Sequence, residues 1–437
     1  MLLTWLAVLL ARGDAWSFHG LTGCSGDWPS NFQQRKLSIA ETVCALSCPS
    51  EPVLEHFLSP FNSGDEEPLL SLQRLDDFCN PEIIRTLVVA VAVWENKIFW
   101  KKCHSDDEDT GHCMTPFSDK DTWHWLRMLQ EILEVVSVKD TLFLVQCGDE
   151  PNVPKDEEAF PVFHPEVGDG FWNIPWPNVF HLKALRTGYL EKAVQVPWQE
   201  KVHKAYWRGS LTAPNDVPKQ EASKVPRLRV FQLVKQKPEL FDVAVERIDN
   251  HLKEMWGKKT VKRLVDENAV NFSKWEVVEK VAPRYRYVLN LNGVVSSWRV
   301  THLLGTGSVL LLQESPTNEA LHGLLEPWKH YVPVAQDLSN LLEVLELLET
   351  NETLAVNLAE AAAEFFARRL RPEDTYCFAM RTLEVSQSKV TMKALQKRGF
   401  EEAPNLASLD SAWRGTKPER LKERLAKRFQ AWQRNEL

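Results

Sequence analysis

Residues 284–313 read RYRYVLNLNGVVSSWRVTHLLGTGSVLLLQ, and this stretch carries the clearest signal of the fold class. The apolar segments 287–291 and 308–312 have the length and composition of buried β-strands. Between them lie a turn of small residues, 292–297, and an apolar run typical of a short helix. This order predicts parallel strands covered by helices, with ligands bound at the carboxyl ends of the strands.

The same alternation of strand-like and helix-like segments extends through the rest of the chain. Strands are expected at 86–100 (two, joined by a turn), 141–147 and 241–245, and helices at 123–136, 338–348 and 354–370. Ser339 is a candidate N-cap, and Pro372 limits the helix that precedes it. Residues 151–200 are rich in Pro and Trp, as in a linker or a segment that lines a cleft. The pattern predicts a two-domain α/β protein with a nucleotide-type cleft.

Composition excludes several classes of protein. The chain has 437 residues and a net charge of -8, so it can bury two cores but lacks the basic surface of a nucleic-acid-binding protein. The apolar run 2–10 resembles a short secretory signal, with a buried first helix or strand as the alternative. No later segment has membrane-spanning length, so we expect no membrane span.

Cysteine usage indicates an oxidising compartment, because six of the 8 cysteines lie in the first 113 residues. We expect Cys103 to bond to Cys113, and no zinc site, since no second close pair of Cys or His completes a tetrahedral set. Residues 434–437 (RNEL) are similar to endoplasmic reticulum retention signals. Glycosylation acceptor patterns occur at Asn271 and Asn351. These features predict a location in the lumen of the secretory pathway.

The turn at 292–297 is suited to a diphosphate. It follows a strand and precedes an apolar run, so its backbone N–H groups and small side chains can approach phosphate oxygens closely. Arg299, expected one turn into the following helix, can neutralise phosphate charge with two hydrogen bonds. A plain turn at Gly293 and a surface ion pair at Arg299 are the alternatives.

Several motifs occur in order between about Asp140 and Leu383. They are AYWRGSLTAP at 205–214, KPELFDV at 237–243, the stretch 284–313, and LEPWKHYVPVAQDLSNLLE at 325–343. This pattern resembles the Rumi-like protein O-glucosyltransferases, which are grouped as glycosyltransferase family 90. The resemblance implies a GT-B type fold, in which two Rossmann-like domains face each other across a cleft.

The resemblance also implies the residues that bind a UDP-sugar donor. They are Ser210, Arg227, Gly293, Val294, Val295, Ser296, Ser297, Trp298, Arg299 and Glu319. Arg229 remains the alternative to Arg227, because extra residues follow Pro214. Glu319 would accept hydrogen bonds from the ribose hydroxyls, with a solvated loop glutamate as the alternative reading.

The expected catalytic base follows the strand at 141–147. Residues 144–151, LVQCGDEP, resemble the family's strand-end motif, in which an aspartate is the proposed base. This implies that Asp149 takes the proton from the acceptor hydroxyl, with Glu150 as the rival. Gln146 and Asn173 stand where the family has Asn and, frequently, Asp, so the acceptor is left open.

The resemblance also bears on disulfides, with one departure and one match. Pro283 and Thr306 lie near the positions of a family disulfide within the donor domain, so that bond is missing here. The resemblance implies that Cys377 joins the C-terminal half to Cys44 or Cys48.

Together these observations predict an inverting glycosyltransferase that moves glucose or xylose from a UDP-sugar to a protein hydroxyl in the endoplasmic reticulum lumen. The same chemistry on a glycan and a catalytically silent binding protein are the alternatives. We expect no metal, no other cofactor and no nucleic-acid partner. The expected divisions are a signal at 1–20, an acceptor-side domain at 21–195, a donor domain at 196–385 and a basic helical extension at 386–437.

Overall fold

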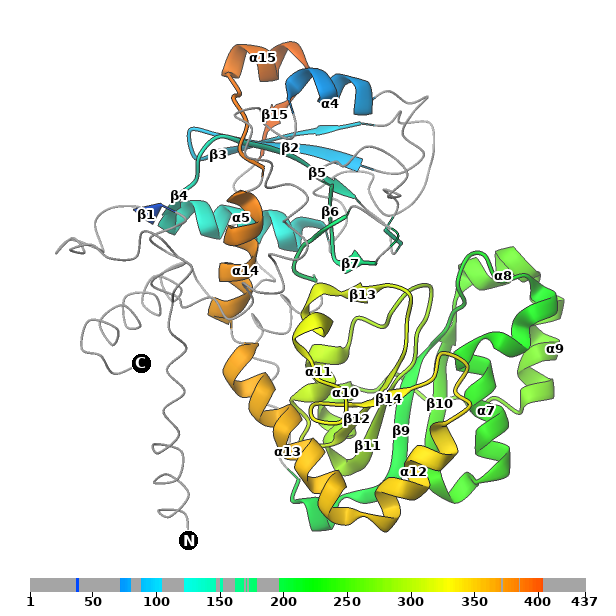
Figure 1. Ribbon diagram of the computed structural model, residues 1–437. Coiled ribbons are helices and arrows are strands. Elements are labelled where there is room, and N and C mark those ends of the chain that lie inside the picture. Colours follow the sequence, from blue (N-terminus) through cyan, green and yellow to red (C-terminus); the bar gives the residue numbers. More distant parts are fainter. Residues whose placement is uncertain are drawn as a thin grey trace, which may run out of the picture.

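The computed structural model is an α/β protein with two main sheets (Figure 1). It describes residues 37–38, 71–79, 88–103, 122–146, 150–151, 162–168, 170, 173–178, 196–370, 372–384 and 386–403. The expected signal at 1–20 and residues 404–437 of the expected basic helical extension lie outside these residues. The α/β class predicted from the sequence is confirmed.

The larger parallel sheet is formed by the second half of the chain. Its strands are β9 (Val202–Leu211), β10 (Phe241–Ile248), β11 (Tyr285–Asn290), β12 (Val309–Gln313) and β14 (Val332–Val334). They lie in the order β10-β9-β11-β12-β14, and every neighbouring pair is parallel. The strands expected at 241–245, 287–291 and 308–312 are therefore present. In chain order the sheet begins with β9, and β10 pairs on one side of it. β11, β12 and β14 then follow on the other side, so the topological switch point lies between β9 and β11.

Side chains of this sheet alternate between two buried faces. Trp207 packs in one core with Leu289 and Leu311, whereas Tyr206 packs in the opposite core with Val288. The helices of this half are α7 (Pro226–Gln236), α8 (Asn250–Trp256), α9 (Lys258–Asn268), α10 (Val278–Val281), α11 (Val300–Leu304), α12 (Leu341–Thr350) and α13 (Glu352–Arg369). Burial on both faces explains why these strands read as continuous apolar runs.

The helices expected at 338–348 and 354–370 correspond to α12 and α13. Ser339 is not the N-cap of α12, because the helix begins one residue later, after Asn340. Asn340 uses its side-chain oxygen to accept a hydrogen bond from the backbone N–H of Ala335. Pro372 opens the next helix, α14 (Pro372–Glu384), where a proline ring is tolerated.

The second sheet is mixed and comes mostly from the first half of the chain. Its strands are β2 (Val88–Trp94), β3 (Lys97–Lys102), β5 (Thr141–Gln146), β6 (Val162–His164), β8 (Ile174–Pro175) and β15 (Glu401–Glu402), in the order β15-β3-β2-β5-β6-β8. The β2–β3 hairpin turns at Glu95 and Asn96, which both have positive φ, as two-residue hairpin turns favour. The pairs β5–β6 and β6–β8 are parallel, and the others are antiparallel.

Four helices pack with this sheet, and the chain returns to it at its end. They are α4 (Leu72–Phe78), the expected α5 (Thr122–Val135), α14 and α15 (Met392–Lys397). Figure 1 shows α13 and α14 leading from the parallel sheet back to α5. Two short pairs complete the structure: β1 (Leu37–Ser38) with β4 (Val136–Ser137), and β7 (Glu166–Val167) with β13 (Asn318–Glu319). The second pair joins the two halves.

The expected bond between Cys103 and Cys113 is wrong. Cys103 follows β3, and its backbone N–H donates to Val88, so it lies at the open end of the β2–β3 hairpin. Cys79 directly follows α4, and it forms the disulfide with Cys103, with the two Cα atoms 4.4 Å apart. Cys44, Cys48, Cys113 and the side chain of Cys377 lie outside the described part, so the second expected bond stays a prediction.

A buried lysine, Lys201, links Pro283 and Thr306, the residues near the positions of the missing family disulfide. Lys201, 4% exposed, donates from Nζ to the carbonyl oxygens of Pro283 at 2.5 Å and Thr306 at 3.2 Å, and to Ser308 Oγ at 3.2 Å. These three acceptors come from segments that precede β11 and β12. Burial lowers the pKa of Lys201 to about 8. The ammonium group therefore links the amino-terminal edge of the parallel sheet in place of a covalent bond.

We expect Lys201→Met to lower the free energy of unfolding by about 2 to 4 kcal/mol at pH 7, because it leaves buried carbonyl oxygens without a donor. Urea denaturation measures the loss. Lys259→Met, on the exposed side of α9, is the matched control and should stay within about 0.5 kcal/mol of the wild type. Equal stabilities for the two variants would contradict a linking role for Lys201.

Candidate functional site

The expected donor residues of the parallel sheet meet at the topological switch point. Ser210 lies near the carboxyl end of β9, and residues 291–299 lead from β11 to α11. Arg299 directly precedes α11 as its N-cap residue, and does not lie one turn inside the helix as expected. Because both strands end at the same edge, side chains from β9 and from the β11–α11 loop can act on one ligand.

Arg227 ties the ends of these two strands together. From α7, its guanidinium donates to the carbonyl of Ser210 at 2.8 Å, to Thr212 Oγ1 at 2.9 Å and to the carbonyl of Leu291 at 3.0 Å. A Cβ atom on Gly293 would lie 2.8 Å from both the Arg227 Nη2 and Thr212 Oγ1 atoms. Glycine is required at 293 for lack of space, since any side chain would displace the guanidinium.

Arg229, the alternative donor arginine, lies elsewhere on α7. Its Nη2 is 3.8 Å from Asp337 Oδ2, and Asp337 lies near the start of α12. Ser210 Oγ accepts a hydrogen bond from Arg247 Nε at 2.8 Å. The structure thus brings Arg227 and Ser210 together, with Arg247 as a neighbour that the sequence had not suggested.

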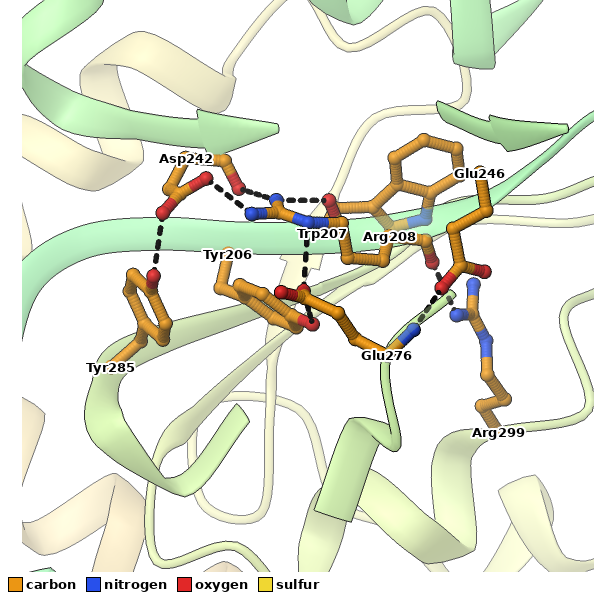
Figure 2. Close-up of polar contacts among 8 residues, drawn as sticks. All are labelled: Tyr206, Trp207, Arg208, Asp242, Glu246, Glu276, Tyr285 and Arg299. Carbon is orange, nitrogen blue, oxygen red and sulfur yellow. Dashed lines mark hydrogen bonds and ion pairs between the residues drawn. The ribbon is translucent and has the colours of Figure 1, made fainter. Parts of the chain in front are cut away.

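Arg299 is held against the end of β9 (Figure 2). Its Nη1 donates to the carbonyl oxygen of Arg208 at 2.5 Å, and its Nε lies 3.4 Å from Ser297 Oγ. A Cβ on Gly209 would lie 3.2 Å from Arg299 Nη2, so Gly209 permits this approach. Burial lowers the pKa of Arg299, and the nearby carboxylate of Glu246 opposes the shift. An arginine keeps its charge under such a shift, so a concentrated positive charge lies at the switch point.

A partly buried polar network fixes the strand segment that receives Arg299 (Figure 2). The Arg208 guanidinium contacts Asp242 Oδ1 at 2.7 Å and Glu276 Oε2 at 3.0 Å. Tyr206 donates to Glu276 at 3.0 Å, and Tyr285 donates to Asp242 at 2.5 Å. Burial acts to raise the pKa of Asp242, but hydrogen bonds from Tyr285 and Arg208 outweigh it and hold the pKa below its usual range.

Sequence reasoning missed this network. Arg208 lies in the motif 205–214 and Asp242 in the expected strand 241–245, so an arginine and an aspartate in two motifs were the available signal. Their pairing depends on the strand order, which places β10 beside β9. Glu276 gave no signal of its own.

The middle of the loop turns toward the other half of the molecule. Ser296 Oγ and Trp298 Nε1 both donate to Glu166 Oε1, at 2.5 and 2.6 Å. The half-buried Val294 and Val295 complete the turn, in which the Gly293 N–H donates to the carbonyl of Val295 at 2.9 Å. Glu166 was not expected from the sequence, because it lies in the segment between 151 and 200 that lacks periodicity.

Glu319 is buried beside Glu166. The two residues face each other in the β7–β13 pair, and they are 3% and 0% exposed. Burial raises the pKa of Glu319 well above its usual range, the charge of Glu166 adds to the shift, and a hydrogen bond with Asn178 opposes it. His322 Nε2 lies 3.9 Å from Glu319 Oε1, but burial lowers the pKa of His322 to about 4. His322 is therefore neutral at pH 7, so it adds no positive charge beside the carboxyl pair.

Asp149, the expected base, lies outside the described residues. Gln146, at the end of β5 and three residues before Asp149 in the sequence, accepts a hydrogen bond from Asn173 Nδ2 at 2.9 Å and donates to the carbonyl of Glu150. The rival base Glu150 is exposed. Gln146 and Asn173, which both depart from the family pattern, are thus hydrogen-bond partners in one buried amide pair.

Within the residues that the structure describes, no group of three or more His, Cys, Asp or Glu side chains is placed to hold a metal ion. Among the helices of the same residues, none combines the length and apolar character needed to cross a bilayer.

Comparison with known proteins gives a consistent result. A family model described as glycosyl transferase family 90 matches residues 85–431. Human protein O-glucosyltransferase 1 is 25% identical over 372 residues, which are 80% of this chain and 82% of that protein. Human protein O-glucosyltransferase 3 is 27% identical over 207 residues, 47% of this chain and 36% of that protein. A solved structure of HepE from Anabaena with UDP and glucose covers 42% of this chain and 48% of its own, at 11% identity and a TM-score of 0.30, too low to support an inference.

The raised pKa of Glu319 predicts how Glu319→Gln changes stability with pH. The folded pKa exceeds the unfolded value of about 4.3, so the stability contribution of the protonated carboxyl is complete below that pH and is lost as the pH rises through the folded pKa. Glutamine has no proton to lose, so the variant should gain stability relative to the wild type between pH 5 and pH 8. Urea denaturation at pH 5 and at pH 8 tests this, with Glu254→Gln at an exposed position of α8 as the control. An identical difference at the two pH values would contradict it.

Proposed function

Because the chain belongs to glycosyl transferase family 90, we propose that it transfers a sugar from a UDP-sugar to a hydroxyl acceptor without a metal ion. The observation that carries this proposal is the pair of guanidinium groups, Arg227 and Arg299, at the carboxyl ends of β9 and β11. Doubly wound sheets bind anionic nucleotides at this point, where two strands leave in opposite directions.

The donor diphosphate would lie against the loop 292–299. Arg299 would neutralise the charge that grows on the leaving diphosphate as the glycosidic bond breaks. Arg227 would keep the ends of β9 and β11 at the correct separation, since its donors are directed to their backbones. Ser210, Ser297 and the loop backbone would supply further hydrogen bonds to the donor.

In this proposal Glu319 does not contact the ribose hydroxyls, which differs from the role that the resemblance implied. It is 3% exposed and faces Glu166 across the β7–β13 pair, so direct contact with the ribose hydroxyls would require it to leave that site.

The proposed base is Asp149, three residues beyond the end of β5. As the acceptor oxygen attacks the anomeric carbon with inversion, Asp149 would take the hydroxyl proton, and the UDP leaves on the opposite side. Glu150 is the alternative base. The Gln146–Asn173 pair at the end of β5 would orient the segment that carries both carboxylates.

A protein hydroxyl is the proposed acceptor, because the similar curated proteins are protein O-glucosyltransferases. The second candidate is a glycan, since the Gln146–Asn173 pair departs from the family pattern on the acceptor side. The lumen of the endoplasmic reticulum is the proposed location, and the Cys79–Cys103 disulfide supports it. The proposed division assigns the donor to residues 196–385 and the acceptor to 21–195, after a signal at 1–20 and before an extension at 386–437.

Arg299→Ala should weaken UDP binding by about 1.5 to 3 kcal/mol, the loss expected for a charge-assisted hydrogen bond to phosphate. Titration calorimetry with UDP measures the change. Arg263→Ala on α9, whose side chain is 66% exposed, is the matched control and should bind UDP as the wild type does. Unchanged affinity in a folded Arg299→Ala variant would remove Arg299 from the donor site.

Asp149→Asn should lower the rate of sugar transfer by about 100-fold or more while UDP binding persists. Asparagine keeps the size of aspartate but cannot accept the proton. A transfer assay with UDP-glucose and UDP-xylose over a panel of protein and glycan acceptors gives the rates. If Glu150→Gln abolishes transfer and Asp149→Asn does not, Glu150 is the base. A wild type that binds UDP and transfers to no acceptor would support the silent binding protein.

A further inference from the structure

Glu166 reaches the proposed donor loop from the opposite half of the molecule. It lies on β7, between β6 and β8 of the mixed sheet in the chain. β7 leaves that sheet to pair with β13, which follows β12 of the parallel sheet. A carboxylate from the acceptor-side half is therefore placed beside the loop that connects β11 to α11.

Glu166 is buried, and its two contacts with the loop are short. Its Oε1 accepts hydrogen bonds from Ser296 Oγ at 2.5 Å and from Trp298 Nε1 at 2.6 Å, and the residue is 0% exposed. Hydrogen bonds to an ionised carboxylate are about twice as strong as those between neutral groups. Losing the acceptor would also leave the indole N–H and the hydroxyl without this partner.

The loop depends on such contacts because it has no regular secondary structure. Residues 291–299 lie between β11 and α11, and their backbone conformation is fixed by individual hydrogen bonds. Asn290 Nδ2 donates to the carbonyl of Ser297 at 3.0 Å, and Asn292 Nδ2 donates to that of Glu314 at 2.9 Å. Those two bonds hold the ends of the turn from within the parallel-sheet half. Glu166 holds its middle from outside.

We propose that Glu166 is a positioning residue for the donor, which holds the loop 292–299 in its binding conformation through Ser296 and Trp298. This inference rests on the proposed function of the loop. The side-chain hydrogens of Ser296 and Trp298 point to Glu166, so these residues shape the loop and leave phosphate contacts to Ser297, Arg299 and the backbone.

The position of Glu166 links the donor loop to the docking of the two halves. If the halves move apart, the β7–β13 pair separates and both hydrogen bonds to Glu166 break. The loop is then ordered for the donor only while the acceptor-side half is in place. This arrangement lets donor affinity depend on the relative position of the halves.

The test compares Glu166→Ala with the conservative Glu166→Gln in the full chain. Glu166→Ala should raise the Kd for UDP about tenfold, as expected for the loss of one or two such hydrogen bonds. Glu166→Gln keeps a carbonyl acceptor at the same place and should stay within about threefold of the wild type. Glu254→Ala, on the exposed surface of α8, is the matched control, and melting temperatures show that each variant is folded.

A second readout, hydrogen–deuterium exchange of peptides that cover residues 291–303, needs no ligand. Exchange should increase in Glu166→Ala and remain near the wild type in Glu166→Gln. Unchanged exchange, or faster exchange with unchanged UDP affinity, would overturn the positioning role. If Glu166→Ala is not folded, Trp298→Phe, which removes the indole N–H, must reproduce the faster exchange. A wild type that binds no UDP, with the exchange difference present, would contradict the proposed function and leave the loop contact standing.

Discussion

The guanidinium of Arg227 connects the two strands between which the proposed donor site lies. Three of its hydrogen bonds end on residues that follow or end β9 and β11, and two of these are backbone carbonyls. The site exists because a parallel sheet reverses its direction of growth between these strands, and a reversal leaves their ends open. The Arg227 guanidinium lies against Gly293 between the ends of these strands, in space that a side chain at 293 would occupy. This contact therefore fixes the separation between the strand that carries Ser210 and the loop that leads to Arg299.

The fold was predictable where burial alone determines the pattern. β11 and β12 are buried on both faces, so their sequences are continuous apolar runs that can be identified without knowing their neighbours. The turn at Glu95 and Asn96 was similarly clear, since polar residues interrupt two apolar strands. The Cys79–Cys103 bond was missed because no spacing rule in the sequence favours Cys79 over Cys113 as the partner of Cys103. Disulfide partners are set by where helix and hairpin ends meet in space, and a short spacing between two cysteines does not report this.

The site was predictable in its residues and not in its contacts. Motifs identified Ser210, Arg227 and Arg299, but an arginine in a motif does not reveal whether it faces a ligand or a backbone carbonyl. Glu166 is 130 residues from Ser296 and 132 from Trp298, and no local pattern encodes contacts over that separation. The burial of Glu319 was also hidden, because a glutamate after a strand is ordinarily solvated. Asn173 and Gln146 could be noted as departures, but only the structure shows that they form one pair.

The link made by Lys201 has a consequence for folding in the cell. Residues 148–376 contain no cysteine, so the parallel sheet is held without any bond that an oxidant must form or a reductant can break. At the end of the sheet where β11 and β12 begin, the ammonium group of Lys201 links the two segments. These hydrogen bonds form when the carbonyl groups come together and need no oxidation. The sheet can thus reach its final form while the chain is still fully reduced. Thiol–disulfide exchange then acts on the cysteine-rich first part of the chain, where Cys79 and Cys103 form their disulfide.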